Sequence, residues 1–545
     1  MKKSYLLALS LLSASIAQAY EQDKTYHLTI LHTNDHHGHF AENEKGEAGM
    51  AARKALIDSI RAEVKEKGGE LLLLSAGDIN TGTPESDMLK AEPDFIGMHE
   101  IGYDAMAIGN HEFDHAVEVL QHQMDLAKFP FLSANVKYKN DYLGKPYAIF
   151  ERGGLKIGVL GLTTEDTAKL GNPEIVKDVV FELPIDTAKT VLKQWSEQEK
   201  PDIKIALTHL GYYHNENHGT NAPGDVTLAR SLDKSALDLI IGGHTHDTVC
   251  VHPDGSFNDE YQAGDACTPD FQNGTWIMQA GEWGKYVGRA DFTFKNGELK
   301  LENYQLLPVN LKKTVKEGEE KKLVLYGEAI QPDADLAKRF EPFVEQSKAL
   351  LEQKVGSVEG LLDGERTHVR FFPTNFGRMM SDAHKARTKA DLAITNSGGI
   401  RASLENGDVS YKNVLTVLPF GNTLVTVELS GEELLNYLNV VALKSIDSGA
   451  YAQYSSNLAM VVNRETQSVS DVVIDGQPLD KDKRYVVALN NYIAAGGDGY
   501  PVLKIHPTYV DTGFVDADAL KWYIEQNSPI KADAFNPNGE VKFVP

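Results

Sequence analysis

The stretch Leu28 to His37, LTILHTNDHH, places an apolar run directly before polar residues that can bind metals. Short continuous apolar runs are typical of strands buried in an α/β sheet. The same order recurs at Leu71 to Leu74 before Gly77-Asp78, at Ile205 to Leu207 before Thr208-His209, and at Leu239 to Ile241 before Gly242-Gly243-His244. Such sheets bind ligands at the carboxyl ends of their strands. The pattern therefore predicts a layered α/β domain with a site where these strands end.

The rest of the chain divides around one charged segment. Helical patterns separate the predicted strands, for example at Ala51 to Lys65 and Thr187 to Glu197. The segment from Gln331 to Val355 carries apolar residues at roughly helical spacing, and we interpret it as a linker helix in which Pro342 marks a kink or a first turn. From Gly356 new strands and glycine-rich turns begin. We therefore predict an N-terminal α/β domain at 20–330, a linker helix at 331–355 and a smaller α+β domain at 356–545.

The N-terminus has the pattern of a signal peptide. Met1-Lys2-Lys3 precedes an apolar run from Tyr5 to Ile16, and Ala17-Gln18-Ala19 is a small-x-small cleavage site. The alternative, a membrane-spanning helix, needs about 20 apolar residues, and this run is shorter and contains serines. We therefore expect residues 1–19 to be removed, and the mature chain to be periplasmic, without a membrane span or a lipid-anchor cysteine.

Length and charge limit the partners. A chain of 545 residues exceeds what one hydrophobic core usually supports, so two domains are expected. The formal charge of −24 repels polyanions, which argues against a nucleic acid polymer as partner. A small phosphorylated ligand can bind where cations or arginines reverse the local field. We expect the protein to act on such ligands as a monomer.

Only two cysteines are present, Cys250 and Cys267, in a segment rich in Asp, Gly and Pro. An oxidising compartment would allow them to form a disulfide, which we predict. Two free thiols are the alternative. Metal ligation is disfavoured because no other cysteine is available.

Seven oxygen and nitrogen donors follow the predicted strands. In an extended segment Asp35 and His37 point to the same side, so one metal can bind both. A lone histidine after a strand is more often structural, but the order and strand-end placement of the whole set indicate a site for two cations with one bridging carboxylate. The set is Asp35, His37, Asp78, Asn110, His209, His244 and His246.

These motifs resemble those of the calcineurin-like metallophosphoesterases. The runs Leu31-His32-Thr33-Asn34-Asp35 and Gly109-Asn110-His111-Glu112-Phe113-Asp114 resemble the 5'-nucleotidase branch in particular, and the resemblance covers essentially the whole mature chain. It implies an N-terminal metallophosphoesterase sandwich and two divalent ions, Zn, Mn, Co or Mg. It also implies that Asp35, His37, Asp78 and His246 hold one ion, and that Asp78, Asn110, His209 and His244 hold the other. His246 stands where the periplasmic enzyme of this branch has glutamine.

His111 and Asp114 lie three residues apart. In a helical turn Asp114 can orient His111, which would then stabilise the transition state or assist the leaving oxygen. The alternatives are that His111 is a further metal ligand or a core histidine.

The second domain carries candidate substrate-binding residues. The guanidinium group of arginine can donate paired hydrogen bonds to phosphate oxygens. Arg401 also follows a glycine-rich turn, which allows close approach of a ligand. Taken singly, the arginines are more often solvated and the aromatic residues more often packed in a core. The resemblance implies that Arg366, Arg370 and Arg401 bind phosphate, that Asn396 lies near the base, that Phe420 and Tyr492 sandwich the base, and that Asp498 accepts from the ribose.

We therefore expect hydrolysis of nucleoside 5'-phosphates, and also of nucleotide sugars and nucleoside di- and triphosphates. The alternatives are a 2',3'-cyclic nucleotide phosphodiesterase with 3'-nucleotidase activity, a dimanganese thiosulfate-processing relative, and a non-catalytic exported nucleotide-binding protein. Because one domain would bind the metals and the other the base, the resemblance also implies a large rotation of the second domain about the linker helix.

Overall fold

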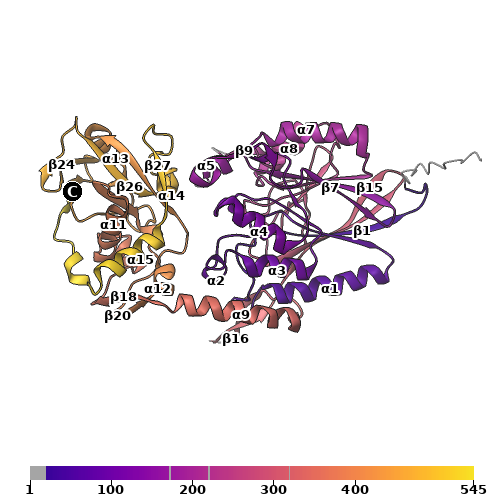
Figure 1. Cartoon of the computed structure of the whole chain (residues 1–545), viewed down its shortest axis with the longest axis horizontal. Helices are drawn as coiled ribbons and strands as arrows, with labels where there is room; N and C mark the ends of the chain where they lie inside the picture. Colours follow the sequence, from indigo (N-terminus) through magenta and orange to yellow (C-terminus); the bar gives the residue numbers. More distant parts are fainter. Residues whose placement is uncertain (1–19, 44, 171–172, 219–220, 318–319, 545) are drawn as a thin grey trace, which may run out of the picture.

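The structure, a computed structural model, describes residues 20–43, 45–170, 173–218, 221–317 and 320–544. The predicted signal peptide at 1–19 lies outside these residues. Figure 1 shows two bodies, an N-terminal one in indigo to pink and a C-terminal one in orange to yellow, with helix α9 (Ala334–Leu351) passing beneath them.

Two six-stranded sheets form the centre of the N-terminal body. The first sheet has the order β15 (Glu298–Pro308), β14 (Tyr286–Lys295), β1 (Tyr26–Thr33), β2 (Glu70–Ser75), β3 (Ala105–Ala107) and β4 (Phe131–Leu132). The second has the order β12 (Asp270–Gln272), β13 (Thr275–Met278), β11 (Leu239–Ile241), β10 (Ile203–His209), β8 (Leu155–Thr163) and β7 (Tyr147–Arg152). Strands β1 to β4 are parallel, as are β8, β10, β11 and β13, so their carboxyl ends meet at one edge.

The predicted strands are buried on both faces, which explains their continuous apolar runs. Alternate residues point to opposite sides: Ile30 and Leu72 belong to the core between the sheets, whereas Leu31 and Leu73 pack under the helices. Ile205 contributes to the inner core from the second sheet. Burial of both strand faces thus fixes the register that brings the strand ends together.

Helices cover the outer faces of this sandwich (Figure 1). Below the first sheet lie α1 (Met50–Glu66), α3 (Glu92–Ile101) and α4 (Val117–Ala127), and over the second lie α7 (Pro184–Gln194) and α8 (Asp225–Ser231). A π-helical turn at Trp195–Glu199 continues α7. The smaller elements are α2 (Pro84–Asp87), α5 (Thr167–Leu170), α6 (Pro173–Val176), β5 (Val136–Tyr138), β6 (Asp141–Tyr142), β9 (Val179–Phe181), β16 (Lys312–Glu317) and β17 (Glu320–Leu325).

Helix α9 lies within the segment expected to be a linker helix. Asp333 caps it by accepting a hydrogen bond from Leu336 N at 2.8 Å. The helix continues through Pro342. Phe340 is buried against Phe40, with ring centroids 5.2 Å apart, so the first half of α9 is fixed to the N-terminal body.

Three sheets and six helices, described in residues 352–544, form the C-terminal body. The five-stranded sheet has the order β22 (Ala452–Tyr454), β19 (Leu392–Asn396), β26 (Arg484–Asn490), β21 (Thr423–Ser430) and β27 (Val510–Val515). The others are β25 (Gln477–Pro478), β24 (Ser468–Ile474), β23 (Leu458–Asn463) with β29 (Val541–Val544), and β20 (Gly407–Ser410), β18 (Lys354–Glu359) with β28 (Ile530–Lys531). The helices are α10 (Arg366–Val369), α11 (Asn375–Thr388), α12 (Tyr411–Val417), α13 (Gly431–Val441), α14 (Asn491–Ala494) and α15 (Asp516–Asn527).

The fold confirms the prediction of an α/β sandwich followed by a smaller α+β domain. Cys250 and Cys267 form the predicted disulfide. Across the described ranges, no helix combines the length and the apolar character that crossing a bilayer requires.

Candidate dinuclear metal centre and substrate site

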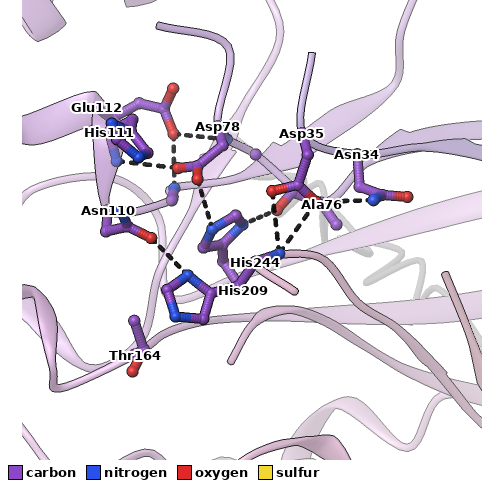
Figure 2. Close-up of polar contacts among 12 residues, drawn as sticks. Asn34, Asp35, Ala76, Asp78, Asn110, His111, Glu112, Thr164, His209 and His244 are labelled. Carbon is purple, nitrogen blue, oxygen red and sulfur yellow. Dashed lines mark hydrogen bonds and ion pairs between the residues drawn. The ribbon is translucent and has the colours of Figure 1, made fainter. Parts of the chain in front are cut away.

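All seven predicted metal donors meet at the carboxyl ends of the central strands, and Figure 2 shows five of them, Asp35, Asp78, Asn110, His209 and His244. Three donors follow strands of the first sheet: Asp35 follows β1, Asp78 follows β2 and Asn110 follows β3. Three more come from the second sheet: His209 is the last residue of β10, and His244 and His246 follow β11. His37 comes from the same turn as Asp35. The two sheets thus contribute about equally to one centre.

Five of these donors have a left-handed backbone, namely Asp35, His37, Asp78, His244 and His246, with φ between 48° and 87°. The expectation that Asp35 and His37 share a side because the segment is extended was wrong: β1 ends at Thr33, and the turn curls both side chains inward. Non-glycine residues in this region are strained and cluster at functional sites, and Asp and His tolerate it better than most.

Asp35, His37 and His246 form the first group of donors. His246 Nε2 lies 3.3 Å from Asp35 Oδ1 and 3.1 Å from His37 Nε2. The other ring nitrogen of His37 donates to Thr81 O at 2.7 Å, which leaves its Nε2 lone pair facing the group.

Asp78, His209, His244 and Asn110 form the second group. Asp78 Oδ2 lies 2.9 Å from His209 Nε2 and 3.8 Å from His37 Nε2, so this carboxylate faces both groups. Asn110 Oδ1 lies 2.7 Å from His244 Nδ1. The backbone of Gly109 passes so close that a Cβ there would lie 2.2 Å from Asp78 Oδ1, which explains the glycine before Asn110.

His111 and Asp114 form a pair beside the second group. A 3₁₀ turn at His111–Phe113 brings His111 Nδ1 to 2.6 Å from Asp114 Oδ2, and the two rings of His111 and His37 lie 5.0 Å apart. Desolvation works against the charged imidazole, but the Asp114 and Asp78 carboxylates raise the pKa of His111 to about 10.

The predicted substrate residues of the C-terminal body gather at the end of β19 and β26. Asn396 donates to Asp498 Oδ2 at 2.8 Å, and the Tyr492 hydroxyl donates to Asp498 Oδ1 at 3.2 Å. The guanidinium of Arg401 lies 5.6 Å from the ring centre of Phe420. Phe420 and Tyr492 are 56% and 47% exposed, so neither is packed in a core.

The three arginines lie near one another. Burial and the positive charges of Arg366 and Arg401 lower the pKa of Arg370. Like charges held together in a chain of net charge −24 make a local positive field.

The loop that carries Phe420 faces the metal-donor centre. A Cβ built on Gly421 would lie 3.8 Å from Thr81 Cγ2, and the carbonyl of Thr81 is the group that holds His37. The residue after Phe420 therefore approaches the turn that holds one of the metal donors.

Comparison with known proteins identifies the family. A model of the calcineurin-like phosphoesterase family matches residues 28–248, and one of the 5'-nucleotidase C-terminal domain matches residues 354–505. Protein UshA of Yersinia enterocolitica is 53% identical to this chain over 541 residues, covering 98% of each, and the 5'-nucleotidase of Vibrio cholerae is 51% identical over 554 residues, covering 99% of this chain and 100% of that protein. The chain belongs to the 5'-nucleotidase family.

A solved structure supports the family assignment over both domains. The crystal structure of a 5'-nucleotidase precursor from Thermus thermophilus is 31% identical, with a TM-score of 0.61, and the match covers 95% of this chain and 99% of that one. Membership makes this chain a metal-dependent nucleotide hydrolase with an N-terminal metallophosphoesterase domain.

The donor atoms fit the divalent cations that the family implies. His209 Nε2 is buried and lies 2.9 Å from Asp78 Oδ2 without making a hydrogen bond, so the two atoms converge on a common point. Donors about 2.0–2.2 Å from one ion lie about 3–3.5 Å from each other, which the pairs Asp35–His246 at 3.3 Å and His37–His246 at 3.1 Å match. Carboxylate, amide and imidazole donors suit Zn, Mn and Co, and Mg less well.

The protonation of the histidines also suits metal binding. Burial lowers the pKa of His244 to about 4 and also lowers that of His37, so both are neutral, as ligands must be. Burial works against charge on His209 and His246 as well, but the neighbouring Asp78 and Asp35 carboxylates raise their pKa values to about 9 and about 10. Cations would displace these two protons, so binding should weaken as the pH falls.

Sequence reasoning missed the residues that hold the donors in place. The buried Glu112 carboxylate accepts from the backbone of Asp78, Ile79 and Gly109 at 3.0, 2.8 and 2.6 Å and so fixes two ligand turns (Figure 2). Asn34 donates to Asp35 Oδ2 at 2.7 Å. Both residues lie inside the motifs named above. The spacing of a motif does not reveal which backbone or side-chain groups these two residues bind.

Proposed function

We propose that this 5'-nucleotidase hydrolyses nucleoside 5'-phosphates to nucleoside and phosphate, and that it also cleaves UDP-sugars and nucleoside di- and triphosphates. The observation that carries the proposal is the convergence of two donor groups, with Asp78 facing both, beside the His111–Asp114 pair. The similarity to the 5'-nucleotidase of Vibrio cholerae and to protein UshA of Yersinia enterocolitica, each about half identical over its full length, supports the substrate class.

Two cations would be held by the residues expected from the sequence. Asp35, His37, Asp78 and His246 would bind the first, and Asp78, Asn110, His209 and His244 the second. The chemistry supplied by the bound cations is activation of a water nucleophile and neutralisation of charge on the phosphate.

His111 would donate a hydrogen bond to the phosphate or to the leaving oxygen. Its cationic form is maintained by Asp114, which also fixes the ring through Nδ1 and leaves Nε2 for the substrate.

The C-terminal domain would bind the rest of the nucleotide. Arg366, Arg370 and Arg401 would bind phosphate oxygens, and Phe420 and Tyr492 would stack on the base. Asp498, held by Asn396 and Tyr492, would accept from the ribose hydroxyls. Stacking accepts any base, so a broad nucleotide range is expected.

We further propose the domain boundaries 20–330, 331–355 and 356–545, export of a monomer to the periplasm, and rotation of the C-terminal domain about α9. The leader sequence and the full-length match to relatives support export and boundaries. Detection of the mature N-terminus at Tyr20 in a periplasmic extract, and light scattering on that protein, test these points.

The decisive experiment measures phosphate release from 5'-AMP. The protein is stripped of metal, then supplied separately with Zn, Mn, Co and Mg, alongside Asp78→Asn and the control Asp254→Asn, an exposed aspartate on the disulfide loop. We expect metal to restore release in the parent and in Asp254→Asn, but not in Asp78→Asn. Release restored in Asp78→Asn would contradict the bridging role.

The same assay separates the alternatives. Faster turnover of 3'-AMP or 2',3'-cyclic AMP than of 5'-AMP would favour the cyclic phosphodiesterase. Binding of AMP without release under any metal would favour a non-catalytic binding protein.

A further inference from the structure

The Glu282 carboxylate lies directly behind His246. Glu282 Oε2 is 2.7 Å from His246 Nδ1, on the side of the ring opposite to the metal-donor group. The ring's other nitrogen, Nε2, lies 3.3 Å from Asp35 Oδ1 and 3.1 Å from His37 Nε2. Glu282 itself lies in the loop between β13 and β14 and is not one of the proposed ligands.

We propose that Glu282 is a positioning residue that makes His246 a strong ligand and thereby sets the affinity and selectivity of the first cation position. The inference rests on the proposed ligand set. A hydrogen bond from Nδ1–H to the carboxylate fixes the tautomer, so the Nε2 lone pair points at the donor group. The negative charge behind the ring also raises its basicity as a ligand.

This arrangement distinguishes His246 from two other proposed histidine ligands, His37 and His209. The Nδ1 atoms of these two histidines contact uncharged backbone oxygens: Thr81 O at 2.7 Å for His37 and Ala76 O at 2.7 Å for His209. A carboxylate is a stronger acceptor than a carbonyl. The two cation positions therefore differ, and the first should favour Zn or Co over Mg more strongly than the second.

Glu282 is held rigidly, as a positioning residue must be. Lys285 Nζ donates to Glu282 Oε1 at 2.6 Å and lies 4.1 Å from the Trp283 ring centre. Trp283 stacks on His39, with ring centres 4.9 Å apart, and its backbone N–H donates to Asp35 O at 2.6 Å. The loop is thus tied to the turn that carries Asp35, and the distance between Glu282 and the donor group is fixed.

The competing explanation is that Glu282 serves only as the partner of Lys285 and keeps the loop folded. The two explanations differ in what Lys285→Met does. That change removes the ion pair but leaves the carboxylate against His246. If Glu282 acts through His246, Glu282→Gln must have the larger effect on metal binding.

The test is a titration of the metal-stripped full-length protein with Co²⁺, followed by its visible absorption and by bound-metal analysis after dialysis. We expect the parent to bind two equivalents. Glu282→Gln should bind one of them about 10–100-fold more weakly and lose part of the Co²⁺ absorption. Lys285→Met and the matched control Glu302→Gln, which removes a surface pair with Lys300, should keep both equivalents.

A double-mutant cycle with His246→Gln shows whether Glu282 acts through that ring. In the His246→Gln background, Glu282→Gln should have no further effect on Co²⁺ affinity. Additive losses, or an equal loss in Lys285→Met, would overturn the inference. Failure of the parent to bind two equivalents would instead refute the proposed metal centre, so the two failures are distinguishable.

Discussion

At the scale of single residues, the charge state of His111 controls the proposed chemistry. Its raised pKa depends on Asp114, whose carboxylate lies 2.6 Å from Nδ1. Neither residue belongs to the proposed ligand set, although His111 lies close enough to His37 and Asp78 for a cation to bind all three. Metal content measured in variants of this pair therefore distinguishes a catalytic role of His111 from a ligand role.

We predict that His111→Gln lowers kcat for 5'-AMP hydrolysis by about 10²–10⁴-fold, the range for general acid–base groups. Asp114→Asn should lower it less, because the imidazole remains. Bound metal, measured by elemental analysis, should stay at the parent level in both variants. A loss of metal in His111→Gln would make His111 a ligand instead.

A second titratable residue, Asp516, affects stability. Burial raises the pKa of this carboxyl to about 7, above the value of about 3.9 expected in the unfolded chain. Between these values the unfolded state loses its proton first, so the free energy of unfolding falls as the pH rises from about 4 to about 7.

Asp516→Asn removes this titration. We expect the melting temperature of the variant to depend less on pH and to exceed that of the parent at pH 8. The exposed Asp482→Asn, in the same domain, serves as control. An unchanged pH profile in Asp516→Asn would show that this carboxyl is ionised in the folded protein.

At the scale of elements, the strand ends were predictable and the turns after them were not. Runs such as Ile205 to Leu207 are buried on both faces, and sequence alone reveals that. The left-handed φ of Asp35 and His244 depends on tertiary contacts: His244 N donates to both oxygens of Asp35, 209 residues away. Glu282 was missed for the same reason, since its partner His246 is 36 residues earlier.

The loop closed by Cys250–Cys267 follows the turn that carries His244 and His246. It is fixed to the sheet where Val249 N donates to Gln279 O at 3.1 Å. A disulfide between residues 17 positions apart lowers the entropy of the unfolded chain, which stabilises the folded state by about 3 kcal/mol.

Cys250→Ser with Cys267→Ser should therefore lower the unfolding midpoint in urea, whereas kcat at 25 °C and bound metal should stay near the parent values. Parent protein measured in the same buffer is the reference. A large loss of metal in the double variant would mean that the disulfide shapes the ligand turn directly.

At the scale of the whole molecule, the proposed function requires both domains to contribute to one reaction. Thr81 and Gly421 mark a place where they approach each other. Cysteines at both positions, Thr81→Cys with Gly421→Cys, would form a cross-link that prevents rotation of the C-terminal domain.

If rotation accompanies each turnover, oxidation of this variant should abolish multiple turnover, and dithiothreitol should restore it. Each single variant and the parent receive the same treatments, which controls for the changes themselves and for reduction of the native disulfide. Full activity in the cross-linked protein would refute the rotation.

The metal centre has one more consequence, because its donors come from both sheets of the sandwich. Any ion bound there joins the two sheets and stabilises the folded state by an amount that grows with the logarithm of its concentration. Chelation should lower the melting temperature of the N-terminal domain while the C-terminal domain melts as before, which calorimetry can resolve. A cell starved of metal would then lose this protein to proteolysis as well as losing its activity, so its abundance would report the metal supply of the compartment.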